Sequence, residues 1–286
     1  MNMMQGSQRH RSSRPFAVIL GTNEIASAVA VHLHKGGYGV VLSHDPSPPV
    51  IRRKMAFHDA LFDDPVVVAG VTAKRGDTGL EILAMLAQQR EVIITRLGML
   101  DLIVLGSLDI LVDARMQKYR TTPDLRRLAR FTIGLGPGFS AGENCDVAIE
   151  TRPTKAIRII QTGTTDEADG VAPPLANRGA ERLVYATVSG RWHTAIEIGS
   201  RIFKDFVVGH LGGVAVGAPF DGTLRGVVRD DTEVPAGVKL LEVDPRVRGA
   251  VWTGIDDRAR GIAEAVMTAI ARYHTELQRS LASARP

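Results

Sequence analysis

The chain has 286 residues, a length that predicts two domains, and its 44% hydrophobic and 23% charged residues exclude disordered and fibrous classes. A net charge of +4 with 5% aromatic residues argues against a nucleic-acid-binding protein, because such proteins need a concentrated basic face and stacking aromatics. With one cysteine no internal disulfide can form, and no apolar run approaches the about 20 residues that cross a bilayer, so we expect a cytoplasmic protein without a membrane partner.

The N-terminal part predicts a parallel sheet with helices on its faces. After a basic tail at 1–15, expected to be disordered and without the apolar core of a signal peptide, an apolar run at 16–20 predicts a buried strand. A helix follows over 23–35, and a second helix over 79–89 carries Leu80, Leu83 and Leu86 on one side. The alternation favours a Rossmann-like α/β domain over 16–162. Further strands are predicted at 40–42, 66–72, 92–95, 109–112, 131–135, 147–151 and 157–161.

The C-terminal part carries an internal repeat. A polar loop at 163–181 leads to the segment 186–190, which returns at 218–222 with an offset of 32 residues that persists from Ile202 to Val234. Two interlocking units of this kind are typical of the lipoyl- or biotinyl-type barrel-sandwich, which we expect over 182–246. The joint at 209–213 contains no lysine, so we expect no covalent biotin or lipoyl group there. A final helix over 255–280 is predicted to pack back on the Rossmann-like domain.

The first candidate site is the turn after the first strand, where a Rossmann domain binds pyrophosphate. Gly21 and Asn23 lie in this turn and are candidate ligand-binding residues. Asn23 replaces the second glycine of the usual fingerprint, and His44 stands where an acid usually binds the ribose, which leaves Asp45 for that role. A bound dinucleotide and an ordinary capped helix start are therefore both open.

The second candidate site is a glycine-rich loop over 134–142. No clear helix follows the loop, so it does not fit the dinucleotide fingerprint. Its backbone N–H groups and one hydroxyl can cradle an anion, and a tight structural turn is the equal alternative. The candidate ligand-binding residues are Gly134, Gly136, Gly138 and Ser140.

Charged and thiol side chains complete the candidates. Asp113 follows a predicted strand and can act as a base or acceptor, with Arg115 as a clamp for phosphate or carboxylate; an ion pair between the two is the alternative. Arg52 and Arg53 form a basic cluster that either meets an anionic ligand or is solvated. Cys145 is either a nucleophile or a small core residue. Asp113 and Cys145 are thus the catalytic candidates, and no metal site is expected from the spacing of the histidines.

Motifs that lack specificity alone occur here in one order along the chain. They are Arg52-Arg53 with 56–57 and 59–60, the segment 112–116, the segment 133–139 with Cys145 and 149–151, the segment 218–226, and 244–246. Together, from residue 16 to 270, they resemble the YqeB family, the selenium-dependent molybdenum hydroxylase system proteins. The chain departs from the family in the first turn, at His44, and at Asp146, where the family has a histidine.

The resemblance implies an accessory protein that matures a molybdenum hydroxylase of the xanthine dehydrogenase type. The candidate ligands are then the molybdopterin cofactor or a nucleotide, and the candidate partner is the hydroxylase or another enzyme complex. An NAD(P)-dependent oxidoreductase is the first alternative. The second is a non-catalytic structural subunit, in a homo-oligomer or a larger complex, whose nucleotide site has decayed.

Overall fold

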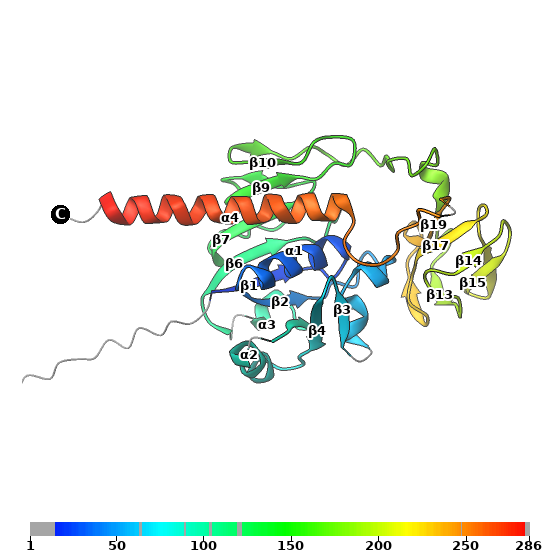
Figure 1. Cartoon of the computed structure of the whole chain (residues 1–286), viewed down its shortest axis with the longest axis horizontal. Coiled ribbons are helices and arrows are strands. Elements are labelled where there is room, and N and C mark those ends of the chain that lie inside the picture. Colours follow the sequence, from blue (N-terminus) through cyan, green and yellow to red (C-terminus); the bar gives the residue numbers. More distant parts are fainter. Residues whose placement is uncertain are drawn as a thin grey trace, which may run out of the picture.

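The computed structural model describes residues 15–62, 65–88, 90–102, 105–118, 122–246 and 248–283. It contains a nine-stranded sheet with helices on both faces and, beside it, a unit of two four-stranded sheets (Figure 1). The mixed α/β class that the sequence predicts is therefore confirmed. Within the described ranges, no helix is long and apolar enough to span a lipid bilayer.

The large sheet is built from the apolar runs of the N-terminal part. Its strands are β1 (Phe16–Leu20), β2 (Gly39–Ser43), β3 (Val66–Val68), β4 (Val71–Arg75), β5 (Val92–Thr95), β6 (Leu108–Asp113), β7 (Ala129–Leu135), β9 (Val147–Glu150) and β10 (Arg158–Ile160). They lie in the order β10-β9-β7-β6-β1-β2-β5-β4-β3, and all neighbours are parallel except at the edge strands β10 and β3. The chain first builds outward from β1 through β2 and then returns to its other side with β6. Ligands of open α/β sheets bind outside the carboxyl ends of the strands at such a switch point.

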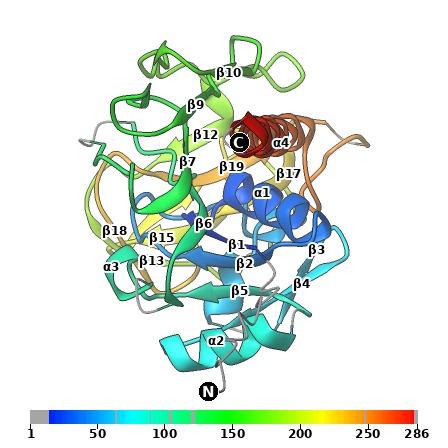
Figure 2. The same ribbon diagram turned by 90° about the vertical axis from the view of Figure 1, so that its left-hand side faces the viewer.

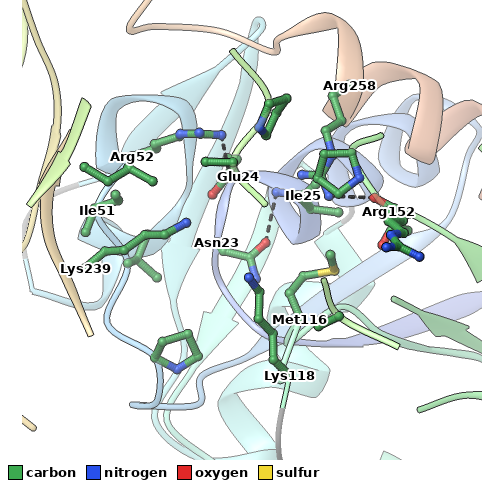
Figure 3. Close-up of a pocket in the computed structure, with 18 of the residues that line it drawn as sticks. Asn23, Glu24, Ile25, Ile51, Arg52, Met116, Lys118, Arg152, Lys239 and Arg258 are labelled. Atoms are coloured by element: carbon green, nitrogen blue, oxygen red, sulfur yellow. Dashed lines mark hydrogen bonds and ion pairs between the residues drawn. The ribbon is translucent and has the colours of Figure 1, made fainter. Parts of the chain in front are cut away.

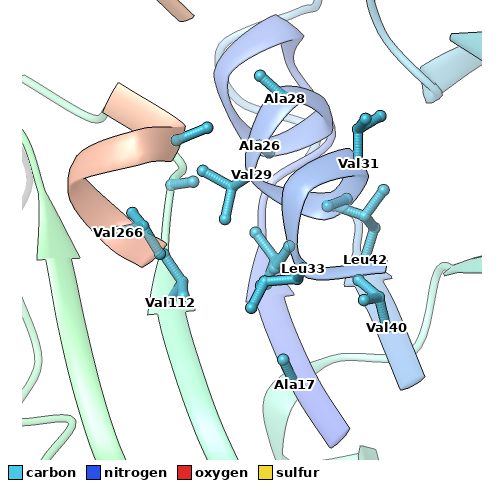
Figure 4. Packing of buried hydrophobic residues seen from close by; sticks show 14 of the residues in the cluster. Ala17, Ala26, Ala28, Val29, Val31, Leu33, Val40, Leu42, Val112 and Val266 are labelled. Atoms are coloured by element: carbon cyan, nitrogen blue, oxygen red, sulfur yellow. The ribbon is translucent and has the colours of Figure 1, made fainter. Parts of the chain in front are cut away.

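Helices cover both faces of this sheet (Figure 2). They are α1 (Glu24–Lys35), α2 (Gly79–Gln88), α3 (Met99–Leu102) and α4 (Asp257–Ser283). Because side chains alternate along a strand, Ala17 of β1 belongs to the apolar core under α1 and α4, whereas Val18 belongs to the core on the side of α2 and α3. Val29 of α1 and Val266 of α4 meet in the first of these cores (Figure 4). The C-terminal helix thus packs against α1 and the large sheet.

One local prediction in this part is wrong, and one differs in detail. The expected single strand at 66–72 is an antiparallel hairpin of β3 and β4, which turns at Ala69 and Gly70, both with positive φ angles of 48° and 79°. Of the leucines expected on one side of α2, Leu86 packs partly buried against the core, whereas Leu80 is 82% exposed and Ile82 is fully buried. The helix rests on the sheet through Ile82, a neighbouring stripe of the same amphipathic pattern.

The second unit consists of two sheets that the repeat interlocks. Its strands are β12 (Leu183–Tyr185), β13 (Gly190–His193), β14 (Arg201–Ile202), β15 (Val207–Leu211), β16 (Val214–Gly217), β17 (Gly222–Val227), β18 (Thr232–Val234) and β19 (Lys239–Asp244). One sheet has the order β12-β19-β17-β14 and the other β16-β15-β13-β18. Adding 32 to the residue numbers of β12, β13, β14 and β15 gives the positions of β16, β17, β18 and β19, in that order. The same shift turns the strand order of one sheet into that of the other. Each of the two sheets therefore contains strands of both copies.

Matching backbone details support the same relation. Asp205 has a φ of 64° and stands at the position of Gly237, whose φ is 83°. The Asp205 N–H donates to the carbonyl of Ala218 at 2.9 Å, and the Gly237 N–H donates to that of Ala186 at 2.8 Å. The two copies therefore share one left-handed turn. Their joint is the hairpin of β15 and β16, which turns at two glycines with positive φ.

The two units are joined by the segment that follows β2. Ile51 packs into the apolar core of the second unit, and its carbonyl accepts a hydrogen bond from the Val227 N–H at 2.8 Å. Gly226 lies at the same contact, because a Cβ at this residue would stand 2.9 Å from the Ile51 carbonyl oxygen. The close backbone approach fixes the second unit beside the carboxyl edge of the large sheet.

This approach predicts that Gly226→Ala destabilises the protein by about 1 to 3 kcal/mol, because the added methyl group must push two backbones apart. Gly249→Ala is the matched control, since the nearest atoms there stand 4.0 Å from the added Cβ. Chemical denaturation of both variants measures the difference. Equal free energies of unfolding would contradict the proposed tight contact.

Candidate functional site

A crevice of about 1040 Å³ lies between the carboxyl edge of the large sheet and the second unit. Its floor contains the turn after β1 and the segment after β6, which form the switch point of the sheet. Its opposite wall comes from residues around β19 and from the start of α4. Figure 3 shows Lys239 and Lys118 extending toward Asn23 from different sides of this space.

The structure brings only some of the predicted site residues to this crevice. Those that line it are Gly21, Asn23, Arg52 and Arg115. Those that do not line it are Arg53, Asp113, Gly134, Gly136, Gly138, Ser140 and Cys145. Arg53 instead pairs with Asp59 and donates to the Val227 carbonyl at 3.0 Å, at the junction of the two units.

Asn23 caps α1 and so occupies the anion position of a Rossmann turn. Its Oδ1 accepts hydrogen bonds from the N–H groups of Ile25 and Ala26 at 2.9 and 3.0 Å, and its Nδ2 donates to the Ala114 carbonyl at 2.7 Å. Gly21 lies against the same loop, because a Cβ there would be 3.0 Å from the Ala114 oxygen. The geometry is that of a capped helix start, in which the side chain satisfies the N–H groups that would otherwise face a phosphate.

The place of the ribose-binding acid is also filled by protein groups. Thr22 Oγ1 lies 3.0 Å from His58 Nδ1 and 3.3 Å from His44 Nδ1, and the two imidazole rings are 5.2 Å apart. His58 is 6% exposed, and its burial, with His44 and Arg53 nearby, lowers its pKa to about 3. Both histidines thus form an uncharged polar cluster after β1 and β2.

Asp113 and Arg115 form an ion pair. Arg115 Nε donates to Asp113 Oδ1 at 3.0 Å, its Nη2 donates to Asp113 Oδ2, and Asp45 lies 3.7 Å from Nη1. The hydrogen bond with Asp113 raises the pKa of Arg115. Arg115 therefore has to leave one of these carboxylates before it can clamp a ligand.

The glycine loop closes on itself as a tight turn. Asn144 Oδ1 accepts from the Ser140 N–H at 2.9 Å, and Asn144 Nδ2 donates to the Gly138 carbonyl at 2.9 Å. The short strands β8 (Ser140–Ala141) and β11 (Gly163–Thr164) pair, so the start of the segment 163–181 is bound to this loop. The donors expected to cradle an anion are in part satisfied by these contacts.

Cys145 lies in the apolar core beside this loop. It is fully buried, and its Sγ donates to the Ser140 carbonyl at 3.7 Å. Burial raises the pKa of the thiol to about 12. A nucleophilic cysteine needs a lowered pKa, so this environment favours the core-residue alternative.

Glu242 of β19, a residue to which no sequence motif assigns a role, lies at the centre of the charged wall. Its side chain is fully buried and binds Arg52 through Nε at 2.7 Å, Arg225 through Nη1 at 3.1 Å, and Arg182. Burial alone would raise the pKa of Glu242, but the three arginines lower it to about 2. Arg52 also binds Glu24 of α1 at 3.0 Å. These contacts join both units around one carboxylate.

We call this group the Glu242 cluster. It comprises the carboxylates Glu242, Glu24 and Asp256 and the cations Arg52, Arg182, Arg225, Arg258 and Lys239. Its sequence signal is the presence of charged residues in strands that otherwise read as apolar: Arg225 in β17, and Lys239, Glu242 and Asp244 in β19.

Cations exceed acids in the Glu242 cluster. Burial and the charge of Arg52 lower the pKa of Lys239, and among the described residues its amino group forms no hydrogen bond or ion pair. The Nε atoms of Arg182 and Arg258 are buried and, among the described residues, have no hydrogen-bond partner. Burial also lowers the pKa of both guanidinium groups. These groups have unused capacity for an anion.

Removing the central charge should destabilise the fold. We expect Glu242→Gln to lower the free energy of unfolding by about 3 to 5 kcal/mol, because three arginines then lack their common buried counter-charge. Glu233→Gln is the control, since Glu233 pairs with Arg191 but is 64% exposed and should contribute at most about 1 kcal/mol. Urea denaturation compares the two, and similar losses would contradict the central role of Glu242.

His58 predicts a sensitivity to mild acid. Its pKa is about 3 in the folded chain and 6.5 when unperturbed, so between these values the unfolded chain binds the extra proton. Stability therefore falls as the pH drops below 6.5, by up to about 1.4 kcal/mol per pH unit. In His58→Gln, the difference in melting temperature between pH 7 and pH 5 should shrink. The exposed His193→Gln should keep it, and equal acid sensitivity of both variants would refute the assignment.

Comparison with known proteins gives one informative match, while no family model matches this chain. YqeB of Escherichia coli K12, described as an uncharacterized protein, is 30% identical over 272 residues, which is 91% of this chain and 48% of YqeB. A crystal structure of an aspartoacylase family protein from Mesorhizobium loti aligns with 10% identity over 82% of this chain and 87% of that chain. Its TM-score of 0.26 is too low to support an argument about fold. The chain spans about half the length of the curated relative, and the match is consistent with a diverged member of the YqeB family.

Proposed function

We propose that the chain is an accessory protein for a molybdenum hydroxylase and binds a phosphate-bearing ligand in the crevice. The single observation that carries the ligand part is the excess of buried cations in the Glu242 cluster. The hydroxylase part rests on the family resemblance, and because the chain matches 48% of YqeB it concerns only what the two share.

The crevice has the chemistry that a phosphate ligand needs. Lys239 stands on the wall of the second unit, and Lys118 and the first turn of α1 stand on the floor. α4 also begins at this crevice, where Asp256 Oδ1 accepts from the Ala259 N–H at 2.8 Å. Asn23 and Asp256 cap these two helix starts, so the attraction for a negative charge comes from the desolvated ammonium group of Lys239. The molybdopterin cofactor and nucleotides both carry phosphate and fit this polarity.

An accessory role agrees with the way in which the other candidate site residues are capped, paired or buried. The cap at Asn23 and the Thr22 and His44 contacts leave little of the first turn for a dinucleotide, which weighs against an NAD(P)-dependent oxidoreductase. Asp113 is paired and Cys145 is buried. We therefore place binding before catalysis, and a non-catalytic subunit of a larger complex is the variant of this proposal that requires no reaction.

The second unit serves in this proposal as a binding wall. We propose that its two sheets form a barrel-sandwich of the lipoyl or biotinyl type, because the repeat interlocks strands of both copies in each sheet. The hairpin between the copies has glycines where a carrier would need a lysine. The unit then contributes side chains to the crevice rather than a prosthetic group.

Binding can be tested with pyrophosphate as the probe. Pyrophosphate should raise the melting temperature of the wild type, and Lys239→Met should weaken its binding at least about tenfold, because one charge-assisted contact is lost. The unliganded variant should remain at least as stable as the wild type, since a desolvated amino group is replaced by an apolar one. Lys204→Met, on the exposed surface of the same unit, is the matched control. If Lys239→Met bound pyrophosphate as tightly as the wild type does, the crevice would not be the binding site.

The accessory role has its own test in the native host. Deleting the gene should lower molybdenum hydroxylase activity without lowering the amount of hydroxylase protein. Wild-type protein and Lys204→Met should restore that activity, and Lys239→Met should not. Full hydroxylase activity in the deletion strain would refute this part of the proposal and leave the binding result unaffected.

A further inference from the structure

The charges of the Glu242 cluster do not balance. Five cations face three carboxylates, and the geometry gives each carboxylate at least one arginine: Glu242 binds three, Glu24 binds Arg52, and Asp256 binds Arg225 at 3.0 Å. Lys239 and Arg258 both lie near Glu24 and Arg52, and among the described residues neither forms an ion pair, although Arg258 Nη2 donates to the Thr151 carbonyl at 2.8 Å. The cluster therefore carries a net charge of about +2 in a largely buried position.

The other charged groups of the crevice do not supply the missing negative charge. Arg115 is balanced by Asp113 and Asp45, and Arg246 by Asp244, which it binds at 2.6 Å. Arg152 is balanced by Asp169 at 2.7 Å. Other carboxylates of the lining are also occupied: Glu150 accepts from the backbone N–H groups of Arg152 and Asp166, and Asp257 pairs with Arg260. Among the described residues, Lys239 and Arg258 are the cluster cations without a carboxylate in ion-pair contact.

A buried donor in this cluster also lacks an acceptor. Arg182 is 3% exposed and lines the crevice, and its Nε has no hydrogen-bond partner among the described residues. Its Nη atoms bind Glu242 and the Pro173 carbonyl, so the guanidinium group is held in place. An unpaired buried donor is unfavourable, and an anion in the crevice would relieve it.

We infer that the phosphate-bearing ligand enters this cluster with a terminal phosphate monoester, a dianion at neutral pH, rather than with a phosphodiester or a carboxylate. The inference rests on the proposed function and narrows its ligand class. A monoester brings two negative charges and three acceptor oxygens to one point. A diester or a carboxylate brings one charge and leaves one buried cation uncompensated. A dinucleotide, whose phosphates are internal, is disfavoured for the same reason.

Two probes of similar shape separate these cases. Phenyl phosphate is a monoester with a second pKa of about 6, and methyl phenyl phosphate is its singly charged diester. At pH 7.5, calorimetry on the full-length protein should give a dissociation constant at least about tenfold lower for phenyl phosphate. Its binding should tighten as the pH rises through about 6, whereas the diester should show no such step. No histidine of the described chain lines the crevice, so a step there reports the probe.

Variants locate the effect and separate the two proposals. Arg258→Met and Lys239→Met should each remove most of the preference for phenyl phosphate, while Arg272→Met, on the exposed side of α4, should retain it. Equal affinity for both probes would overturn the monoester inference and leave a singly charged phosphate ligand in place. If neither probe nor pyrophosphate bound at millimolar concentration, the proposed phosphate site would fall together with it.

Discussion

One buried carboxylate joins the two units of this protein beside the crevice. Glu242 accepts from Arg52 of the N-terminal part, from Arg182 at the entry to the second unit, and from Arg225 within that unit. A charge of this kind is costly to bury unless its partners are fixed, so the two units can be joined here only in one arrangement. The backbone contact between Ile51 and Val227 sets the same arrangement from the other side. The crevice is therefore a consequence of how the units are joined.

The internal repeat accounts for the strand arrangement of the second unit. The side chains that differ between the two copies account for the charged wall of the crevice. The partners of Arg225, Lys239 and Glu242 in the first copy are His193, Val207 and His210. None of these can supply the same charge pattern, and Val207 lies 43% exposed on the opposite end of the unit. Two copies with the same backbone thus differ in the side chains that face the large sheet. The first copy contributes Arg182, Leu183 and Tyr185 to the crevice, and the second copy contributes Arg225 and Lys239.

The sequence predicts the elements that have a local cause and misses those that depend on distant partners. Strand β1 and helix α1 follow from an apolar run and a capping asparagine, both legible within 20 residues. The sequence predicts one strand where the structure has a hairpin at 66–75, because the turn uses a positive φ at Ala69 and alanine does not indicate such a backbone conformation. Arg52 and Glu242 are 190 residues apart, so no local pattern could pair them. The candidates at Asp113 and Cys145 were visible as residue types, but their pairing and burial are properties of the fold.

The crevice combines features that a Rossmann domain usually keeps in one place. In the usual arrangement, backbone N–H groups of the first turn bind the phosphates and an acid after the second strand binds the ribose. Here Asn23 satisfies those N–H groups, and His44 stands in the place of the acid. The positive charge comes instead from side chains across the crevice, above all Lys239. In the proposed site a phosphate would contact both units, because Lys239 lies on the wall of the second unit and Lys118 on the floor formed by the large sheet.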